Sequence, residues 1–228
     1  DYSEFFDKAD EYNAALAALP FALADHTGAD GYDECLNATG NGMMGYIDID
    51  KIQVKLPIYH GTDASTLNTA AGHIEGSSLP VGGKGTHAVI SAHRGLPSAK
   101  LFTDLDRLEI GDTFRITVLD RTMVYEVDRI KTVLPSDVGD LAIEMDADLF
   151  TLVTCTPYGI NTHRLLVRGH RTEQQETRVM HVVSEAYIVE RLIVTPIVAL
   201  PILLVLMLYV FFKPAKKKLP INGDGEIL

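Results

Sequence analysis

The stretch TLVTCTPYGINTHRLLVRG, residues 151–169, decides the fold of this 228-residue chain. Two apolar runs flank a short segment that contains Pro, Gly and Asn, which is the pattern of a β-hairpin. If the two runs pair as antiparallel strands, Cys155 and Arg164 face each other at the mouth of the hairpin, with Cβ atoms about 5 Å apart. Arg164 and Arg168 then share one face, because side chains alternate along a strand.

Similar short runs, separated by Gly and Pro, fill the chain from Gly42 onward. They read MGYIDID, IQVKLPIY, THAVISA, TFRITVL, MVYEVDRIKTV, FTLVTC and RLLVRG. Strands at this spacing predict a mainly β domain, either a barrel or a sandwich.

Two segments carry a helical pattern instead. Residues 2–19 are rich in Ala, Glu and Leu with apolar residues at helical spacing, which predicts an amphipathic helix. Residues 98–108 predict a short helix packed on the barrel, with Ser98 as its N-cap. Between them, residues 20–42 lose the periodicity and accumulate Gly, Asp, Asn and Thr, so we expect a long loop that is either a functional lid or a linker.

Composition excludes several classes of function. The formal net charge of -11 argues against a nucleic-acid partner, since phosphate binding needs clustered Lys and Arg. Two cysteines, Cys35 and Cys155, are too few for a disulfide framework. The chain has neither an HExxH nor a paired CxxC pattern, so no metal site is expected, and the VGGKGTH run lacks the residues of a phosphate-binding loop.

Residues 192–212, LIVTPIVALPILLVLMLYVFF, carry no charge. A helix of this length covers roughly the 30 Å of a bilayer's hydrocarbon core, so we expect a transmembrane helix that contacts the lipid bilayer. The KPAKKK run that follows predicts a cytoplasmic tail, with residues 1–190 outside the cell. Because the sequence starts at Asp1 and not at Met, we expect an export signal or N-terminal anchor to have been removed.

Cys155 and Arg164 suggest nucleophilic chemistry. A guanidinium beside a thiol favours the thiolate and can donate hydrogen bonds to a developing oxyanion. Such a cysteine also needs a proton-transfer partner, and His93 is the best placed, because it ends the apolar run HAVISAH. Four rivals stay open by position: His60, His73, His87 and His163. A lone cysteine at a strand end is, on spacing alone, more often a small buried apolar residue.

Three motifs together resemble the sortases, and within them the pilus-building class C. TLVTC resembles the nucleophile motif of the family, SAHRG its histidine segment and THRLLVRG its arginine strand. The resemblance extends over most of residues 1–175, including GYIDIDKIQVKLPIYHGT and LPVGGKGTHAVISAHRGLPSAKLFTDLDRLEIGDTF. It implies an eight-stranded β-barrel with an N-terminal helix, a lid loop and a C-terminal transmembrane helix.

The chain then divides into five parts. These are an N-terminal helix and lid segment at 1–42, the catalytic barrel at 43–175, a juxtamembrane linker at 176–191, the transmembrane helix at 192–212 and a cytoplasmic tail at 213–228. The resemblance places the barrel on the outer face of the membrane of a Gram-positive cell.

The resemblance also implies a mechanism without a cofactor. Cys155 attacks the Thr–Gly bond of an LPxTG-like sorting signal, Arg164 stabilises the oxyanion and His93 acts as general acid and base. The resulting thioester is resolved by a lysine amine of another pilin, so the partners are pilin precursors that carry such signals.

The lid is where this sequence departs from class C. Its usual Asp-Pro-aromatic motif, whose acid pairs with the catalytic arginine, is absent. The nearest counterparts are Asp25 as the acid, which we prefer, and Phe21 or Tyr32 as the ring. The departure puts the tightness of lid inhibition in doubt and leaves the catalytic residues as they are.

Two alternatives to pilus assembly remain at this point. A cell-wall-anchoring sortase would use the same three residues with an amine of a peptidoglycan precursor, and the lid-like segment argues against it. A catalytically silent pilin-binding scaffold is disfavoured by the intact set of Cys155, His93 and Arg164. A papain-like protease is also disfavoured, because its histidine follows its cysteine in sequence.

Overall fold

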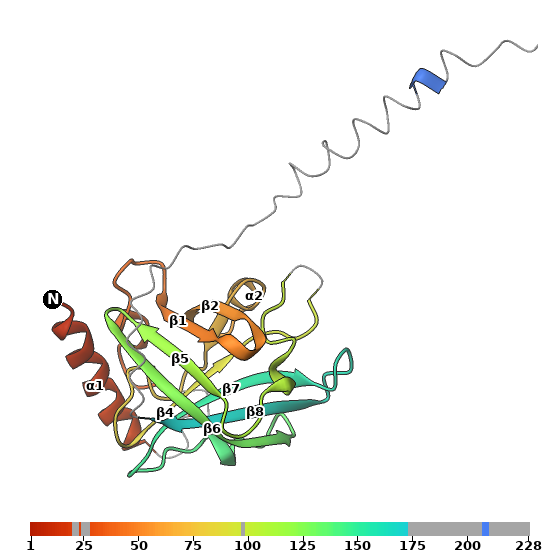
Figure 1. The fold of residues 1–228 in the computed structure, drawn as a ribbon. Helices are drawn as coiled ribbons and strands as arrows, with labels where there is room; N and C mark the ends of the chain where they lie inside the picture. Colours follow the sequence, from red (N-terminus) through yellow and green to blue (C-terminus); the bar gives the residue numbers. More distant parts are fainter. Residues whose placement is uncertain (20–22, 24–27, 97–98, 173–206, 210–228) are drawn as a thin grey trace, which may run out of the picture. The chain divides into compact units, whose positions relative to one another are not determined.

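The computed structural model describes residues 1–19, 23, 28–96, 99–172 and 207–209. Eight strands close into a barrel in the order β1-β2-β3-β4-β7-β8-β6-β5 (Figure 1). The pairs β2–β3 and β4–β7 are parallel and the other pairs are antiparallel. The strands are β1 Met43–Ile49, β2 Val54–His60, β3 Ala71–His73, β4 Thr86–Ser91, β5 Thr113–Val118, β6 Arg121–Val133, β7 Asp148–Thr156 and β8 His163–Arg171.

The barrel predicted from the sequence is therefore confirmed, and each of the seven predicted runs forms a strand. β3 was not predicted, because three residues are too few for an alternating pattern to be recognised. The interior holds a group of aromatic rings, Phe114, Tyr125 and Phe150, whose centroids lie 5.3–5.8 Å apart. Gly169 lies over this group, and a Cβ there would come within 2.8 Å of Phe114 Cε1, so the site needs glycine.

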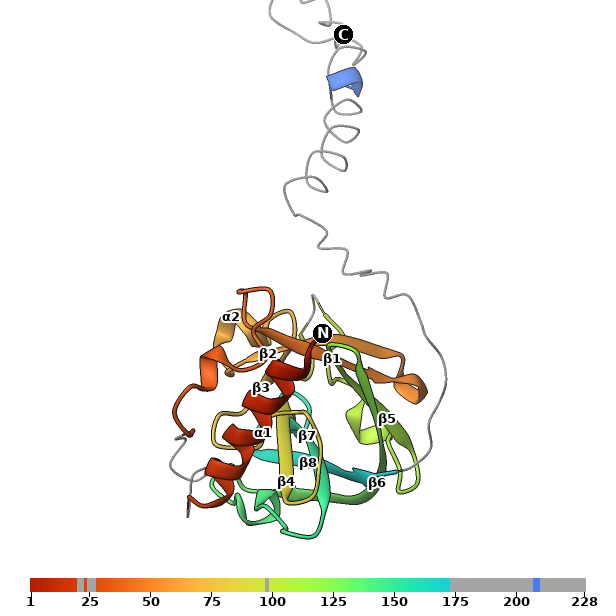
Figure 2. The same ribbon diagram turned by 90° about the vertical axis from the view of Figure 1, so that its left-hand side faces the viewer.

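The predicted N-terminal helix is α1, Ser3–Ala17. Figure 2 shows it alongside the barrel, next to β3 and β4. Asn13 links it to the backbone of Leu79, accepting from the amide at 2.7 Å and donating to the carbonyl at 3.2 Å. The guanidinium of Arg121 lies 3.8 Å from the ring centre of Phe6. The buried face of α1 joins the barrel core through Phe6, Ala9, Tyr12 and Leu16.

The helix expected at 98–108 is wrong in its extent. Only η3, Leu105–Arg107, is helical there, and residues 101–104 form turns. Leu101 has a φ of +41°, which a right-handed helix cannot contain. The leucines are nevertheless buried, as predicted. The remaining short helices are α2 Ala64–Leu67, η1 Tyr32–Glu34, η2 Asp50–Ile52 and η4 Gly139–Leu141.

The chain forms two compact units, Asp1–Thr177 and Arg178–Leu228. In the second unit the structure describes only residues 207–209, which are helical and exposed. Across the described residues, no helix has the length and apolar character needed to cross a bilayer. The span predicted at 192–212 falls outside them, apart from those three residues.

Candidate active site

Cys155 and Arg164 occupy directly opposed positions of the β7–β8 hairpin, as the sequence predicted. Both lie on the outer face of the barrel, because Leu165, which alternates with Arg164, belongs to the interior core. The Cys155 thiol is half-buried. Nη1 of Arg164 donates to the carbonyls of Asn161 and His163 at 3.3 and 3.1 Å, so the hairpin connection holds the guanidinium in place.

His93 reaches this hairpin through a parallel ladder. β4 pairs with β7 along its whole length. Beyond the last ladder pair, the Ala92 amide donates to the carbonyl of Val153 at 3.2 Å, and the Thr154 hydroxyl donates to the carbonyl of Ala92 at 2.8 Å. Ala92 is therefore hydrogen-bonded to Val153 and Thr154, the two residues that precede Cys155. His93 is the next residue after Ala92. The β4–β7 ladder brings the predicted base and the predicted nucleophile to the same end of the barrel.

Two of the rival histidines are completely buried, His73 and His87. Burial lowers the pKa of His73 to about 4 and also lowers the pKa of His87 below its ordinary value. Both rings are therefore neutral near pH 7 and have no access to a bound substrate. Neither is suited to proton transfer at Cys155.

The other two rivals are less well placed than His93. The ring nitrogens of His60 lie 2.9 and 3.0 Å from the carbonyls of Gly42 and Tyr32, in the N-terminal part of the chain. His163 is paired with Thr156, one position beyond Cys155, so strand alternation directs it to the opposite face. These settings favour His93 as the proton-transfer partner.

An apolar row lies directly below the Cys155–Arg164 pair on the same outer face. Its residues come from β4, β7, β8 and the β6–β7 connection at 134–147, and each is at most 7 % exposed: Val89, Leu141, Val153 and Leu166. Three partly buried side chains pack on this row, from Leu23, Ile74 and Val133. The row is thus a small buried cluster that continues from the thiol along the outer face and is covered by these three side chains.

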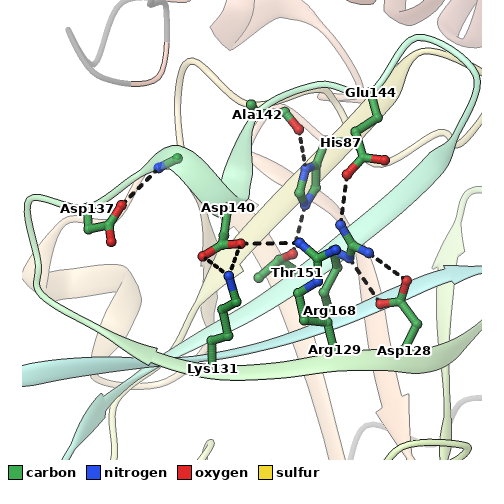
Figure 3. Close-up of polar contacts among 11 residues, drawn as sticks. His87, Asp128, Arg129, Lys131, Asp137, Asp140, Ala142, Glu144, Thr151 and Arg168 are labelled. Atoms are coloured by element: carbon green, nitrogen blue, oxygen red, sulfur yellow. Dashed lines mark hydrogen bonds and ion pairs between the residues drawn. The ribbon is translucent and has the colours of Figure 1, made fainter.

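A charged network lies one step further down the same face (Figure 3). Nε and Nη2 of Arg168 donate to the two carboxylate oxygens of Asp128 at 3.0 and 2.8 Å, and Nη1 donates to Glu144 at 2.9 Å. The Arg168 side chain is 9 % exposed. The hydrogen bonds that Arg168 donates to Asp128, followed by the charges of both carboxylates, raise the pKa of Arg168, so the cation is retained at any physiological pH.

His87 adds a neutral link to this network (Figure 3). Nδ1 lies 2.8 Å from the Ala142 carbonyl and Nε2 lies 2.7 Å from the Thr151 hydroxyl. Since a carbonyl can only accept, Nδ1 carries the proton and Nε2 accepts from the hydroxyl. Ala142 and Glu144 both belong to the β6–β7 connection, so His87 and Arg168 fasten that connection to the sheet next to the apolar row.

The sequence had indicated only part of this arrangement. It placed Arg168 on the face of Arg164 through strand alternation. It gave no sign of its partners. Asp128 lies at an irregularity in the β6–β8 register and Glu144 lies on the β6–β7 connection, and spacing along the chain reveals neither placement.

Of the three candidate lid residues, the structure describes only Tyr32. Asp25 and Phe21 lie outside the described residues. Tyr32 is buried in a different cluster, where its hydroxyl lies 2.8 Å from Nδ1 of His73 and accepts from the Gly61 amide at 3.2 Å. Its role as a lid residue stays a prediction.

The arrangement can support covalent catalysis at sulfur. It offers a partly accessible thiol, a guanidinium opposite it and an imidazole on the neighbouring strand end. In the described part of the chain, no three His, Cys, Asp or Glu side chains group as metal ligands.

Comparison with known proteins agrees with this geometry. The sortase domain family matches residues 47–172. Sortase D of Bacillus subtilis (strain 168) is 30% identical over 130 residues, which cover 56% of this chain and 63% of that protein. The matched part therefore spans less than two thirds of this curated relative.

Solved structures extend the similarity to almost the whole barrel unit. Sortase C1 from Streptococcus agalactiae is 48% identical with a TM-score of 0.72, covering 77% of this chain and 91% of that one. Sortase C1 of GBS Pilus Island 1 is 41% identical with a TM-score of 0.68, covering 78% and 86%. With the family match over more than half of its length, the chain belongs to the sortase family, and its neighbours among solved structures include sortases of the C type.

Proposed function

We propose that the protein is a class C sortase, a cysteine transpeptidase that polymerises pilins. The observation that carries the proposal is the opposed pair of Cys155 and Arg164. The β4–β7 ladder ends at the same end of the barrel, directly before His93. The similarity to sortase C1 of a pilus island supports the pilus role.

In the proposed reaction, the Cys155 sulfur attacks the Thr carbonyl of an LPxTG-like signal. The Arg164 guanidinium donates to the oxyanion that forms. His93 protonates the departing glycine amine as the C–N bond breaks, which leaves a thioester on Cys155. His93 then accepts a proton from an incoming lysine amine, whose nitrogen attacks the thioester. The isopeptide bond forms as the C–S bond breaks, and Cys155 is released as the thiolate beside protonated His93.

The apolar row extends the site along the peptide. Val153 and Leu166 lie two positions along the strands from Cys155 and Arg164 and are buried, so a sorting signal would reach them once the side chains that cover the row move aside. We assign the apolar residue of the signal to this row. We further propose that residues 20–41 act as a lid, which the packing of Leu23 on the row supports.

The membrane part of the proposal rests on sequence alone. Residues 192–212 would hold the barrel at the outer face of the bilayer, where pilin precursors are anchored too. Confinement to one surface raises the effective concentration of the two partners.

The compact unit Asp1–Thr177 is the form to test first. It is incubated with an LPxTG peptide and either hydroxylamine or a lysine-containing peptide, and products are identified by mass spectrometry. Cleavage after Thr with transfer to the amine, lost in Cys155→Ala, is the expected result. Transfer to an amine of a peptidoglycan stem peptide, with none to lysine peptides, would favour a cell-wall-anchoring sortase instead. No transfer by the folded unit, either as the wild type or with the Leu23→Ala change described below, would contradict the enzyme assignment.

The lid is best tested without truncation, because deleting the chain before Gly42 would remove α1 from the core. Leu23→Ala empties the contact with the apolar row and is expected to raise the transfer rate. Leu19→Ala is the matched control, since Leu19 is 45% exposed and lies directly before that segment. Equal rates in both variants would contradict a lid anchored by Leu23.

A further inference from the structure

Arg94 directly follows His93, and its guanidinium contacts Thr156 and Asp106. The side chain is 10% exposed. It forms an ion pair through Nη2 with Asp106, which is on the segment after β4. Nη1 donates to the Thr156 hydroxyl at 3.4 Å. Since Thr156 is the residue after Cys155, one side chain connects the neighbours of the proposed base and nucleophile.

This connection lies beyond the end of the β4–β7 ladder. The backbone ties between the two strands reach Ala92 and Thr154, as described above. Thr156 alternates with Cys155, so its side chain points away from the thiol and toward the barrel end. The Arg94–Thr156 contact therefore joins the two strand ends from the interior side, while His93 and Cys155 belong to the outer side.

The backbone of the histidine segment is also held by the chain that follows it. The Phe102 amide donates to the His93 carbonyl at 3.1 Å, and the Thr103 hydroxyl accepts from the Gly95 amide at 3.1 Å. The Arg94–Asp106 ion pair adds a side-chain contact between the same two segments. His93 thus lies in a segment whose position depends on both β7 and residues 102–106.

Tyr158 closes the same arrangement from the β7–β8 connection. The Arg94 guanidinium carbon lies 5.9 Å from the centre of its ring. The ring also lies close to Gly95, where a Cβ would come within 2.7 Å of Tyr158 Cε2. The Arg94 guanidinium therefore interacts with three chain segments: the segment of Asp106, the end of β7 at Thr156 and the β7–β8 connection at Tyr158.

Stability does not explain this arrangement. Nε of Arg94 is buried and has no hydrogen-bond partner among the described residues. Its carboxylate partner, Asp106, has a side chain that is 48% exposed, which weakens the attraction through solvent. A largely buried cation with one unpaired N–H and one exposed partner contributes little to folding, because its desolvation is poorly compensated.

We propose that Arg94 is a positioning residue that fixes the distance between His93 and Cys155. The proposal rests on the function proposed above. Proton transfer and thioester formation need both groups in one geometry, and a misplacement of about 1 Å can lower a rate about 100-fold. The same geometry decides whether His93 can assist the Cys155 sulfur as a nucleophile, so the reactivity of the thiol should follow it.

The test compares Arg94→Met, Arg94→Lys and Thr156→Val in the unit Asp1–Thr177. The matched control is Arg107→Met, which removes a 70% exposed arginine that pairs with Asp104 in the same segment. Transfer kinetics give kcat and KM separately, and thermal melting reports the fold. Alkylation of Cys155 by iodoacetamide at pH 7, followed by mass spectrometry so that Cys35 is counted separately, reports the thiol without any substrate.

Arg94→Met is expected to lower kcat about 10- to 100-fold with KM within about threefold of the wild type. Its melting temperature stays within a few degrees, and alkylation slows several-fold. Arg94→Lys restores part of kcat, Thr156→Val gives a smaller loss, and Arg107→Met matches the wild type.

Unchanged kcat and alkylation in Arg94→Met would overturn the proposal. So would a loss of kcat in both Arg94 variants that follows a large fall in melting temperature, since Arg94 would then be structural. If the wild type performs no transfer, the function proposed above fails, and the alkylation and melting measurements still decide the role of Arg94.

Discussion

Cys155 and Arg164 are register partners across the β7–β8 hairpin, and Arg164 is at the same time bonded to the carbonyls of Asn161 and His163. The guanidinium carries five N–H donors. In one conformation, the guanidinium can therefore bond the hairpin connection and also donate to the oxyanion that forms when the Cys155 sulfur attacks a carbonyl group. A lysine ammonium at that position could not do both.

Replacing Arg164 should separate charge from shape. Arg164→Met is expected to lower kcat for peptide transfer about 10²- to 10³-fold, as for the loss of an oxyanion donor. Arg164→Lys keeps the charge and should recover only part of the rate. Arg171→Lys, on the same strand at the far end of the hairpin, is the control. A wild-type kcat in Arg164→Met would exclude the oxyanion role.

Removing Arg168 should weaken the hold on the β6–β7 connection. Arg168→Met leaves Asp128 and Glu144 without their shared cation, and we expect the free energy of unfolding in urea to fall by roughly 1–3 kcal/mol. The KM for the sorting peptide should rise, because Leu141 of the apolar row is carried by that connection. Lys8→Met serves as control, since Lys8 is 60% exposed and pairs with Glu4 within α1, outside that connection. If Arg168→Met has the KM of the wild type, the charged network around Arg168 does not contribute to peptide binding.

His73 should make the fold sensitive to acid. Its folded-state pKa of about 4 lies below the ordinary value of 6.5, so the unfolded chain binds the proton more readily. The stability that the neutral ring contributes is present above pH 6.5 and is lost as the pH falls from 6.5 through 4. The difference is on the order of 3 kcal/mol over that range.

Melting temperatures measured between pH 7 and pH 4 test this. His73→Asn should start less stable at pH 7 and lose less on acidification, whereas the exposed His170→Gln should keep the slope of the wild type. His87, whose pKa is also lowered, adds to the slope in all these proteins. An identical slope in wild type and His73→Asn would contradict the assignment.

Gly95 should tolerate no side chain, for two separable reasons. Its φ is +80°, a region that costs other residues roughly 1–3 kcal/mol, and a Cβ would collide with the Tyr158 ring. Gly111 has a φ of +93° with open space around its Cα. Gly111→Ala thus measures the backbone strain alone, and Gly95→Ala should lose more stability and also displace Tyr158. Equal unfolding free energies in urea would mean that the ring moves aside without cost.

The strands could be read from the sequence because they alternate or run apolar over six or more residues, as in β5 and β7. The Cys155–Arg164 pair followed from the hairpin, since a short connection leaves few registers. The position of His93 at the end of an apolar run favoured it among five histidines but could not exclude the other four, because its place beside Cys155 depends on a parallel pairing between segments far apart in the chain.

Other features had no local signal. The predicted helix at 98–108 was wrong because its leucines are buried by turns whose geometry depends on contacts with His93 and Gly95. The sequence also gave no reason to single out Arg94 next to His93. Its partners, Asp106 and Thr156, lie 12 and 62 residues away.

The parallel β4–β7 pairing has a consequence for how the site arises during folding. Thr154 and Ala92 are 62 residues apart in sequence, and contacts of such separation form slowly, because the loop between them must be closed first. The hairpin of Cys155 and Arg164 is local and can form early, while His93 joins only when the barrel closes. A newly synthesised chain would therefore hold its thiol and guanidinium together well before it could transfer a proton, and Cys155 would become fully reactive only after the last long-range contacts had formed.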